Sequence, residues 1–210
     1  MHEGRLGLCQ VYGLRILLGL ALIFGAVVSI TGHIPPAPKP ATASPTEFSA
    51  YRALNHIRIM ARKPHPSGTA ENTRVRDYIL DQIRAMGLTP QLQEALSHRG
   101  PGQVSMVENV LTRIPGTAST GAVLLLAHYD SVAFGPGAAD DISGVSSLLE
   151  TIRALRVGPP LKNDLIFLFT DGEEGRIAGH AGLRGAWAFV HRHPWAKEVK
   201  MAVNFDCRGT

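Results

Sequence analysis

The chain has 210 residues, of which 45% are hydrophobic and 18% are charged. This composition is sufficient for one hydrophobic core, so it excludes a chain that is disordered throughout. The two cysteines, Cys9 and Cys207, are too few for a disulfide scaffold or a four-cysteine zinc module. The net charge of +4 comes without a basic cluster interleaved with aromatic residues, so nucleic acid is not an expected partner.

The first feature along the chain is an uncharged apolar run, ILLGLALIFGAVVSIT, at residues 16–31. Extended to residues 14–32, it approaches the roughly 20 apolar residues that span a bilayer. Arg5 and Arg15 precede the run, and Lys39 is the first positive charge after it. By the positive-inside rule, this bias places the N-terminus in the cytoplasm and the remainder of the chain outside it.

The apolar run therefore predicts a single-pass signal anchor, with residues 1–13 in the cytoplasm and residues 14–32 in the membrane. A cleaved signal peptide and a buried core helix are the alternatives, and a cleaved peptide would have a shorter apolar region and a clearer cleavage site. Residues 33–48, rich in Pro, Ala, Ser and Thr, predict an extended spacer. The domain at 49–210 would then lie in the periplasm, at the cell exterior or in the endoplasmic-reticulum lumen.

From residue 49 on, the hydrophobic pattern switches between the periods of strands and helices. Two of the expected strands are continuous apolar runs, which is typical of strands buried on both faces. The alternation predicts an α/β fold with a mostly parallel or mixed sheet flanked by helices, and ligands of such sheets bind beyond the carboxyl ends of the strands. The expected strands are 104–114, 121–130, 164–170 and 199–205, and the expected helices are 69–86, 144–156 and 181–191.

Ionisable side chains gather at the expected carboxyl ends of three strands. Carboxylates on one edge of a sheet repel one another unless a cation neutralises them. A neighbouring imidazole favours a transition metal such as zinc, and two metal ions about 3.5–4 Å apart that share a carboxylate are a recurring hydrolytic design. The candidate residues are His128 and Asp130, Asp140 in the loop GPGAADDISG, Glu173 and Glu174, and Asp206.

Each candidate also has a plain structural explanation. Asp140 or Asp141 could cap the helix that follows them. Glu173 and Glu174 could be solvated loop charges, and His128 could be a hydrogen-bonded strand-end histidine. Together these explanations leave unexplained why each of the three strand ends carries ligand-type residues.

The segments AHYDS, GPGAADDISGV, LFTDGEEG and VNFD, in this order, resemble the two-zinc exopeptidases of peptidase family M28. The segment KPHPSGTAENTRVRDYILDQIRAMGL at 63–88 is similar to the opening helix of that domain. HPWA at 193–196 is similar to endoplasmic-reticulum metallopeptidase and to bacterial membrane relatives. The resemblance implies a fold like that of zinc aminopeptidases and phosphorylases, and a hydrolase that removes residues from the N-termini of peptide substrates.

The resemblance also implies a role for each candidate residue. Asp140 matches the carboxylate that bridges both zinc ions and is followed by a cis peptide bond. Glu173 matches the general base, and Asp130 matches the carboxylate that orients the histidine ligand. The remaining ligands are His128 and Asp206 on the first zinc ion and Glu174 on the second.

The chain departs from the family pattern in two places. GRIAGHA at 175–181 is an apparent insertion beside the site, and His180 within it is an unfavoured candidate ligand. The family's last histidine ligand has no counterpart before residue 210. We therefore expect a truncated domain with an incomplete sheet, an incomplete second zinc site and little peptidase activity. A non-catalytic binding module and a single-zinc glutaminyl cyclase on the same fold are the alternatives, while substrate specificity and oligomeric state stay open.

Overall fold

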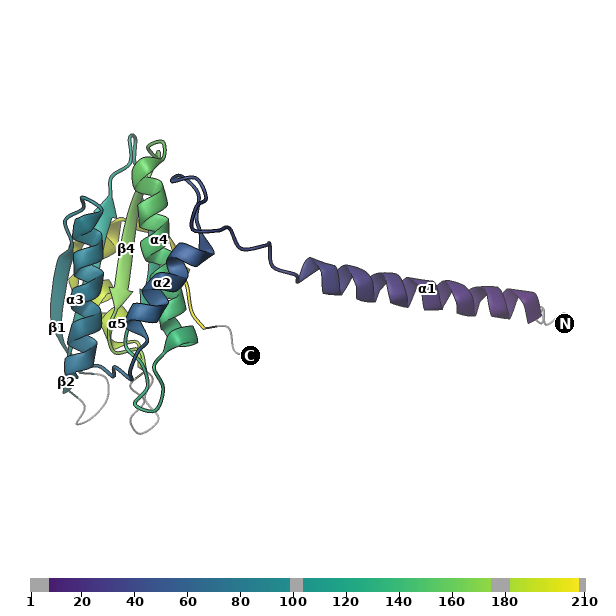
Figure 1. Cartoon of the computed structure of the whole chain (residues 1–210), viewed down its shortest axis with the longest axis horizontal. Coiled ribbons are helices and arrows are strands. Elements are labelled where there is room, and N and C mark those ends of the chain that lie inside the picture. Colours follow the sequence, from purple (N-terminus) through teal and green to yellow (C-terminus); the bar gives the residue numbers. More distant parts are fainter. Residues whose placement is uncertain (1–7, 99–103, 175–181, 208–210) are drawn as a thin grey trace. The chain divides into compact units, whose positions relative to one another are not determined.

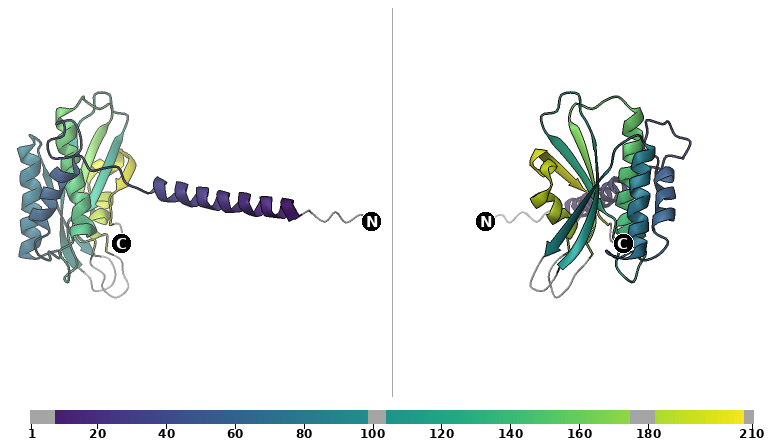
Figure 2. Two further views of the ribbon diagram at one scale, coloured as in Figure 1. Left: turned by 45° about the vertical axis from the view of Figure 1, so that its right-hand side comes forward. Right: turned by 90° about the vertical axis from the view of Figure 1, so that its left-hand side faces the viewer.

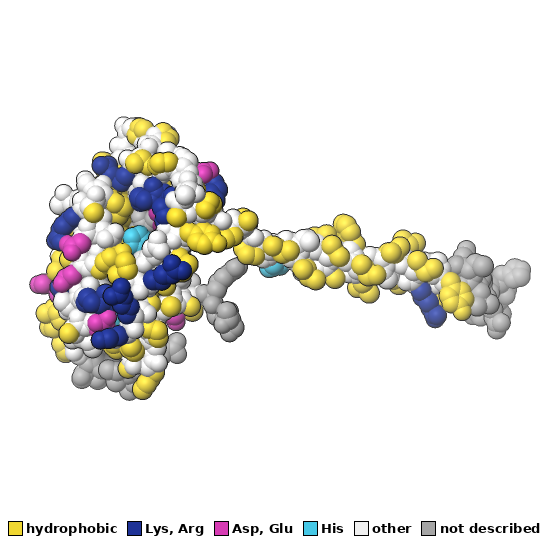
Figure 3. All heavy atoms as spheres, in the orientation of Figure 1, with side chains coloured by type: hydrophobic (Ala, Val, Ile, Leu, Met, Phe, Trp, Pro, Cys, Tyr) yellow, Lys and Arg dark blue, Asp and Glu magenta, His cyan; other side chains and the backbone are white. Residues whose placement is uncertain are grey.

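The computed structural model describes residues 8–98, 104–174 and 182–207, which form two compact units, residues 1–37 and 38–210. The first unit consists of one helix, α1 (Leu8–Gly32). Its segment Val11–Gly32 has a mean hydropathy of 2.3 and is long and apolar enough to cross a membrane. Hydrophobic side chains cover the visible side of this helix along most of its length (Figure 3).

The second unit is built on a mixed five-stranded sheet in the order β1-β2-β4-β3-β5. Strands β4, β3 and β5 are parallel neighbours, whereas β2 runs antiparallel to β1 and to β4. In Figure 1 the sheet is seen past the helices that cover one of its faces. The strands are β1 (Gln91–His98), β2 (Val104–Ile114), β3 (Ala122–His128), β4 (Asp164–Thr170) and β5 (Val199–Asn204).

Helices cover both faces of this sheet, as Figure 2 shows. Three helices lie on one face: α2 (Ala50–Met60), α3 (Ala70–Ala85) and α4 (Ser143–Val157). The other face carries α5 (Arg184–Arg192) and the short 3₁₀ helix η2 (Pro194–Glu198).

Side chains that alternate along the strands divide the core between the two faces. In β4, Phe167 and Phe169 pack into the cluster under α3 and α4, while Ile166 and Leu168 pack into the cluster with Phe189 of α5. All four β4 residues are fully buried. A slip of one residue would exchange the two sets, so packing on both faces fixes the register of β4.

The elements agree with the sequence pattern where the apolar periodicity is strong. Strands β2 and β4 have the expected bounds, and Thr69 is the N-cap of α3, with its side chain accepting a hydrogen bond from the backbone N–H of Asn72. The expected helix at 181–191 begins later, at Arg184, and residue 181 lies outside the described residues. Helix α2 and strand β1 were not predicted from the sequence, and few of their residues are fully buried.

The proline-rich segment contacts the second unit from about Lys39 onward. Guanidinium nitrogens of Arg52 donate hydrogen bonds to the backbone carbonyls of Ala41 (2.6 Å) and Glu47 (2.7 Å). Arg153 of α4 donates to the carbonyls of Pro45 (2.6 Å) and Glu47 (2.8 Å). The role of residues 33–48 as a spacer stays a prediction, but residues 41–47 are held on the folded unit.

A buried carboxylate, Glu150, orients both of these arginines. It accepts hydrogen bonds from Arg52 Nε (2.9 Å), Arg153 Nε (2.6 Å) and the backbone N–H of Ser49 (2.9 Å). Burial raises the pKa of Glu150, but the hydrogen bonds from Arg153, Arg52 and Ser49 outweigh it, so the net pKa is lowered.

We expect Glu150→Gln to lower the free energy of unfolding at pH 7 by about 3 kcal/mol, because it leaves two arginines without their shared anion. The folded-state pKa is lowered, so the contribution is fully present above the unfolded-state pKa and is lost as pH falls through the folded-state pKa. The difference between the two proteins should therefore shrink below about pH 4.5. Urea unfolding, followed by the fluorescence of Trp187 and Trp195, measures the free energy of unfolding of each protein.

Glu71→Gln is the matched control for this experiment. Glu71 forms an i,i+3 ion pair with Arg74 near the surface, where such pairs contribute less than about 1 kcal/mol. Equal losses for the two variants would contradict the role given to Glu150.

Candidate metal centre

The candidate residues lie at the carboxyl edge of the parallel strands. His128 is the last residue of β3 and pairs with Thr170, the last residue of β4. The segments that follow these two strands therefore leave the sheet side by side. On the other side of β3, the pairing with β5 continues to Phe205, whose backbone N–H donates to the carbonyl of Leu126 (2.8 Å). This pairing brings Asp206 to the same edge.

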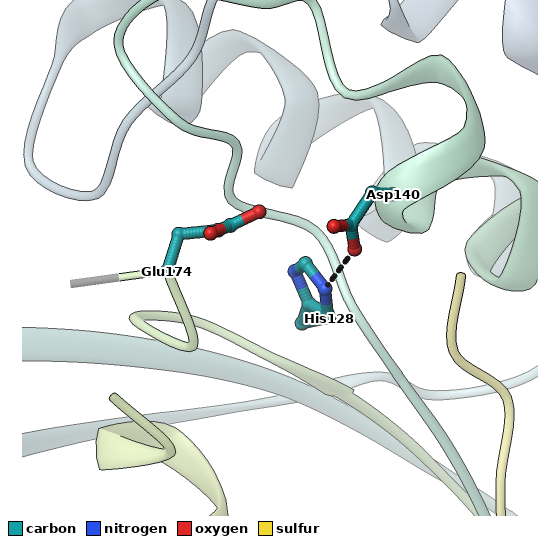
Figure 4. A group of neighbouring side chains, drawn as sticks. All are labelled: His128, Asp140 and Glu174. Atoms are coloured by element: carbon teal, nitrogen blue, oxygen red, sulfur yellow. Dashed lines mark hydrogen bonds and ion pairs between the residues drawn. The ribbon is translucent and has the colours of Figure 1, made fainter. Parts of the chain in front are cut away.

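Three side chains from separate segments converge here (Figure 4). His128, which is 3% exposed, lies with its Nε2 3.0 Å from Oδ1 of Asp140. Potential ligand atoms of His128, Asp140 and Glu174 all lie within 4.8 Å of one another. One imidazole nitrogen and two carboxylate oxygens at this spacing form a donor set that suits a divalent transition metal.

The carboxylate of Asp130 joins the two segments that carry this group. Its Oδ1 accepts a hydrogen bond from the backbone N–H of Glu173 and its Oδ2 from that of Glu174, both at 3.0 Å. The same carboxylate lies 3.6 Å from Nδ1 of His128, and the backbone carbonyl of Asp130 is 3.0 Å from that nitrogen. With Nδ1–H donating to this carbonyl, Nε2 is the ring nitrogen that can bind a metal.

Asp140 and Asp141 have different roles, which resolves one of the alternatives. Asp141 is fully buried, and its carboxylate accepts hydrogen bonds from the backbone N–H of Gly144 (3.1 Å) and of His128 (3.2 Å). Asp141 therefore caps the start of α4, and Asp140 is turned toward His128. The peptide bond between Asp140 and Asp141 is cis, as the resemblance implied.

Several carboxylates surround the imidazole of His128, and they shift the pKa values of the residues in this group. Burial lowers the pKa of His128, but the hydrogen bond and charge of Asp130, with the charges of Asp141 and Glu173, raise it to about 10. Burial raises the pKa of Glu173, and the charges of Asp130, Asp206 and Asp140 raise it further. The pKa of Glu174 is raised by burial and by Asp140. A bound cation would relieve this repulsion.

Asp206 lies at the same edge of the sheet, next to the group of His128, Asp140 and Glu174. It lines a small cavity of about 80 Å³ together with His128 and Glu173. Among the described residues, however, its potential ligand atom lies within 4.8 Å of those of Asp140 and Cys207. Asp140 is thus common to both groups, as a bridging carboxylate would be. The proposed ligand assignments stay predictions, and His180 lies outside the described residues.

The sequence of this chain is similar to those of known peptidases. Residues 109–210 match peptidase family M28. A vacuolar membrane protease of Candida albicans is 39% identical over 156 residues, which cover 73% of this chain and 18% of that protein. The chain carries a peptidase family M28 domain. It spans about a fifth of the length of the curated relatives it matches.

Solved structures support the fold of this M28 domain. A glutaminyl cyclase of Porphyromonas gingivalis superposes with a TM-score of 0.69 at 26% identity, covering 77% of this chain and 60% of that one. A zinc-dependent exopeptidase of Parabacteroides distasonis superposes with a TM-score of 0.65 at 19% identity, covering 79% and 64%. The mixed sheet flanked by helices, predicted from the sequence, is confirmed.

Asp171, which was not among the residues predicted from the sequence, holds the start of the loop that carries the two glutamates. Its fully buried carboxylate accepts hydrogen bonds from Ser67 Oγ (3.0 Å), from the backbone N–H of Glu108 (3.2 Å) and from Asn72 Nδ2 (3.3 Å). Burial and the charge of Asp130 raise the pKa of Asp171 to about 7. The only sequence signal was its position directly after the β4 run.

We expect Asp130→Asn to weaken the binding of Zn²⁺ by about 10–100-fold. The asparagine NH₂ must face the backbone N–H of either Glu173 or Glu174, so one of the two hydrogen bonds to this loop is lost. Competition with a chromophoric chelator measures the affinity. Asp81→Asn, on the exposed side of α3, is the control, and an unchanged affinity in Asp130→Asn would contradict the role of Asp130.

We expect Gly144→Ala to destabilise the domain by about 1–3 kcal/mol, because overpacking in a filled site costs this much. A Cβ at Gly144 would lie 2.5 Å from Oδ1 of Asp141, so the cap would be displaced. Gly158→Ala is the control, since its Cβ would meet no atom closer than 3.4 Å. Equal urea midpoints for the two variants would show that the contact of Asp141 with Gly144 is not required.

Proposed function

We propose that the M28 domain is a zinc-dependent exopeptidase of the aminopeptidase type. The observation that carries the proposal is the convergence of His128, Asp140 and Glu174 beside Glu173, a carboxylate of raised pKa. Support comes from the P. distasonis neighbour, which is a zinc-dependent exopeptidase, and from the C. albicans relative, which is a membrane protease.

In this proposal, some residues bind the metal and another transfers protons. His128, Asp140, Glu174 and Asp206 would hold zinc, which when bound supplies Lewis-acid polarisation of the substrate carbonyl and of a water molecule. Glu173 would accept the proton of the attacking water and deliver it to the leaving amine. Its raised pKa, caused first by burial, suits a group that must both take and return a proton. Asp130 would hold the imidazole and the glutamate loop in place.

For location, we propose that α1 anchors the chain in a membrane with the M28 domain outside the cytoplasm. Support comes from the apolar segment Val11–Gly32 and from Arg15 near its N-terminal end. A reporter fused to the C-terminus should be active only in an extracytoplasmic assay, and recovery of the full chain in the soluble cytoplasmic fraction would contradict the anchor.

A glutaminyl cyclase is the second candidate function, and the P. gingivalis neighbour at 26% identity favours it. The two reactions differ in their products. A peptide with N-terminal glutamine would lose ammonia in a cyclase and would lose its first residue in an aminopeptidase, so mass spectrometry distinguishes them. A non-catalytic binding module would bind peptide without either change.

We expect the zinc-loaded chain to release N-terminal residues from a short peptide only at the low rate that the sequence predicts, and to leave the N-acetylated peptide intact. Glu173→Gln should lower kcat by about 10²–10⁴-fold, because it removes the proton-transfer group, while the amount of bound zinc stays the same. Glu94→Gln, on the exposed edge strand β1, should keep full activity. Release that persists at the wild-type rate in Glu173→Gln would exclude Glu173 as the base.

A further inference from the structure

A cleft of about 350 Å³ adjoins the metal centre at Glu174. Binding sites for small molecules usually measure about 300–1,000 Å³, so the cleft is large enough to take part of a peptide. Its walls come from segments that are distant in the sequence: Pro66 and Ser67 before α3, residues 130–134 after β3, Glu174 after β4, and Arg184 of α5.

Glu174 connects this cleft with the metal centre. It lines the cleft, and it also belongs to the group of potential metal ligands with His128 and Asp140. Figure 4 shows its side chain extending from the segment after β4 toward these two residues. A substrate with one group held at the metal centre can therefore place a neighbouring group in the cleft.

The loop after β3 is fixed at its base and exposed at its tip. Ser131 is fully buried; its backbone N–H donates to the carbonyl of His65 (3.3 Å), and its Oγ accepts a hydrogen bond from the backbone N–H of His65 (2.8 Å). The residues that follow are apolar but exposed, with Val132 at 42% and Phe134 at 98%. Contiguous exposed apolar side chains beside a cleft are typical of a binding surface.

Several polar side chains of the cleft already have hydrogen-bond partners within the protein. Both oxygens of Asp130 accept hydrogen bonds from backbone N–H groups of the glutamate loop. Ser67 Oγ donates to the carboxylate of Asp171 (3.0 Å), and Ser131 Oγ donates to the carbonyl of the residue that follows it (3.0 Å). Apolar contacts are therefore the main contacts that the cleft can make with a ligand side chain.

The charges around the cleft also favour a neutral side chain. The carboxylate of Glu174 and the guanidinium of Arg184 both border it. A Cβ at Gly172 would lie 3.1 Å from Arg184 Nε, so the guanidinium is held against the backbone just before the two glutamates. A charged ligand side chain would meet a group of its own sign in the cleft, whereas an apolar side chain would not.

We infer that the cleft binds the second residue of a peptide substrate, and that Val132 and Phe134 give it a preference for a large apolar side chain there. This inference rests on the proposed peptidase function. When the carbonyl of the first residue lies at the metal centre, the second residue is bonded directly to it. The remaining peptide must continue into solvent, and this cleft is larger than the cavity of about 80 Å³ beside His128 and Glu173.

The test measures peptide binding separately from turnover. The full chain carrying Glu173→Gln, loaded with zinc in detergent, is titrated by calorimetry with Ala-Ala-Ala, Ala-Phe-Ala and Phe-Ala-Ala. We expect phenylalanine at the second position to tighten binding by about 10-fold relative to the alanine peptide, because its ring is buried in the cleft. Adding Phe134→Ala should remove most of this preference, and Phe134→Tyr, which keeps the ring, should retain it.

Leu96→Ala is the matched control, because Leu96 is an apolar residue of β1 that is 50% exposed and does not line the cleft. It should leave the preference unchanged. Phe134 is almost fully exposed, so Phe134→Ala should keep the urea midpoint of its parent, which shows that the variant is folded.

The outcomes separate this inference from the proposed function. A second-residue preference that persists in Phe134→Ala would overturn the inference and leave the peptidase proposal standing, as would a preference for phenylalanine at the first position only. If none of the three peptides binds, the inference is also wrong, while hydrolysis that depends on Glu173 would still support the peptidase. A preference that depends on Phe134, in a chain that hydrolyses none of these peptides, would support the cleft and overturn the peptidase function.

Discussion

The carboxylate of Asp130 is the constraint on which the site depends. It lies beyond β3, yet both its oxygens are occupied by backbone N–H groups of the segment beyond β4. The two strands bring these segments together, and this carboxylate fixes their separation. The backbone carbonyl of Asp130 lies 3.0 Å from Nδ1 of His128, so this one residue contacts the imidazole through its backbone and the glutamate loop through its side chain. A buried carboxylate is tolerable in the interior only when donors surround it.

Asp141 and Asp171, at the two flanks of the site, are also buried carboxylates that need hydrogen-bond donors. Each is buried, and each accepts hydrogen bonds from other parts of the chain. The donors to Asp141 lie at the start of α4 and at the end of β3. The donors to Asp171 lie in β2, in α3 and in the loop before α3. The carboxylates of Asp140, Glu174 and Asp206 belong to the groups of potential metal ligands. Asp141 and Asp171 are thus buried carboxylates with several donors each, whereas Asp140, Glu174 and Asp206 are at least partly exposed.

Elements of the fold that are determined by residues close together in the sequence could be predicted, and elements that depend on distant contacts could not. Strands β2 and β4 and helix α3 were predictable because their apolar period and caps are local. Helix α2 and strand β1 were not, because α2 buries few residues and β1 is a largely polar edge strand that is defined by its pairing with β2. The choice between Asp140 and Asp141 as cap required the turn geometry.

The hydrogen bonds from Arg52 and Arg153 to residues 41–47 define where the folded unit begins. By composition the domain starts at about residue 49, whereas its contacts begin near Lys39, whose carbonyl accepts a hydrogen bond from Ser49. A soluble version of the domain cut at the compositional boundary would leave two guanidinium groups facing water in place of backbone carbonyls. A cut before Pro38 would keep every one of these acceptors, so the practical start site for expressing the domain lies inside the proline-rich segment.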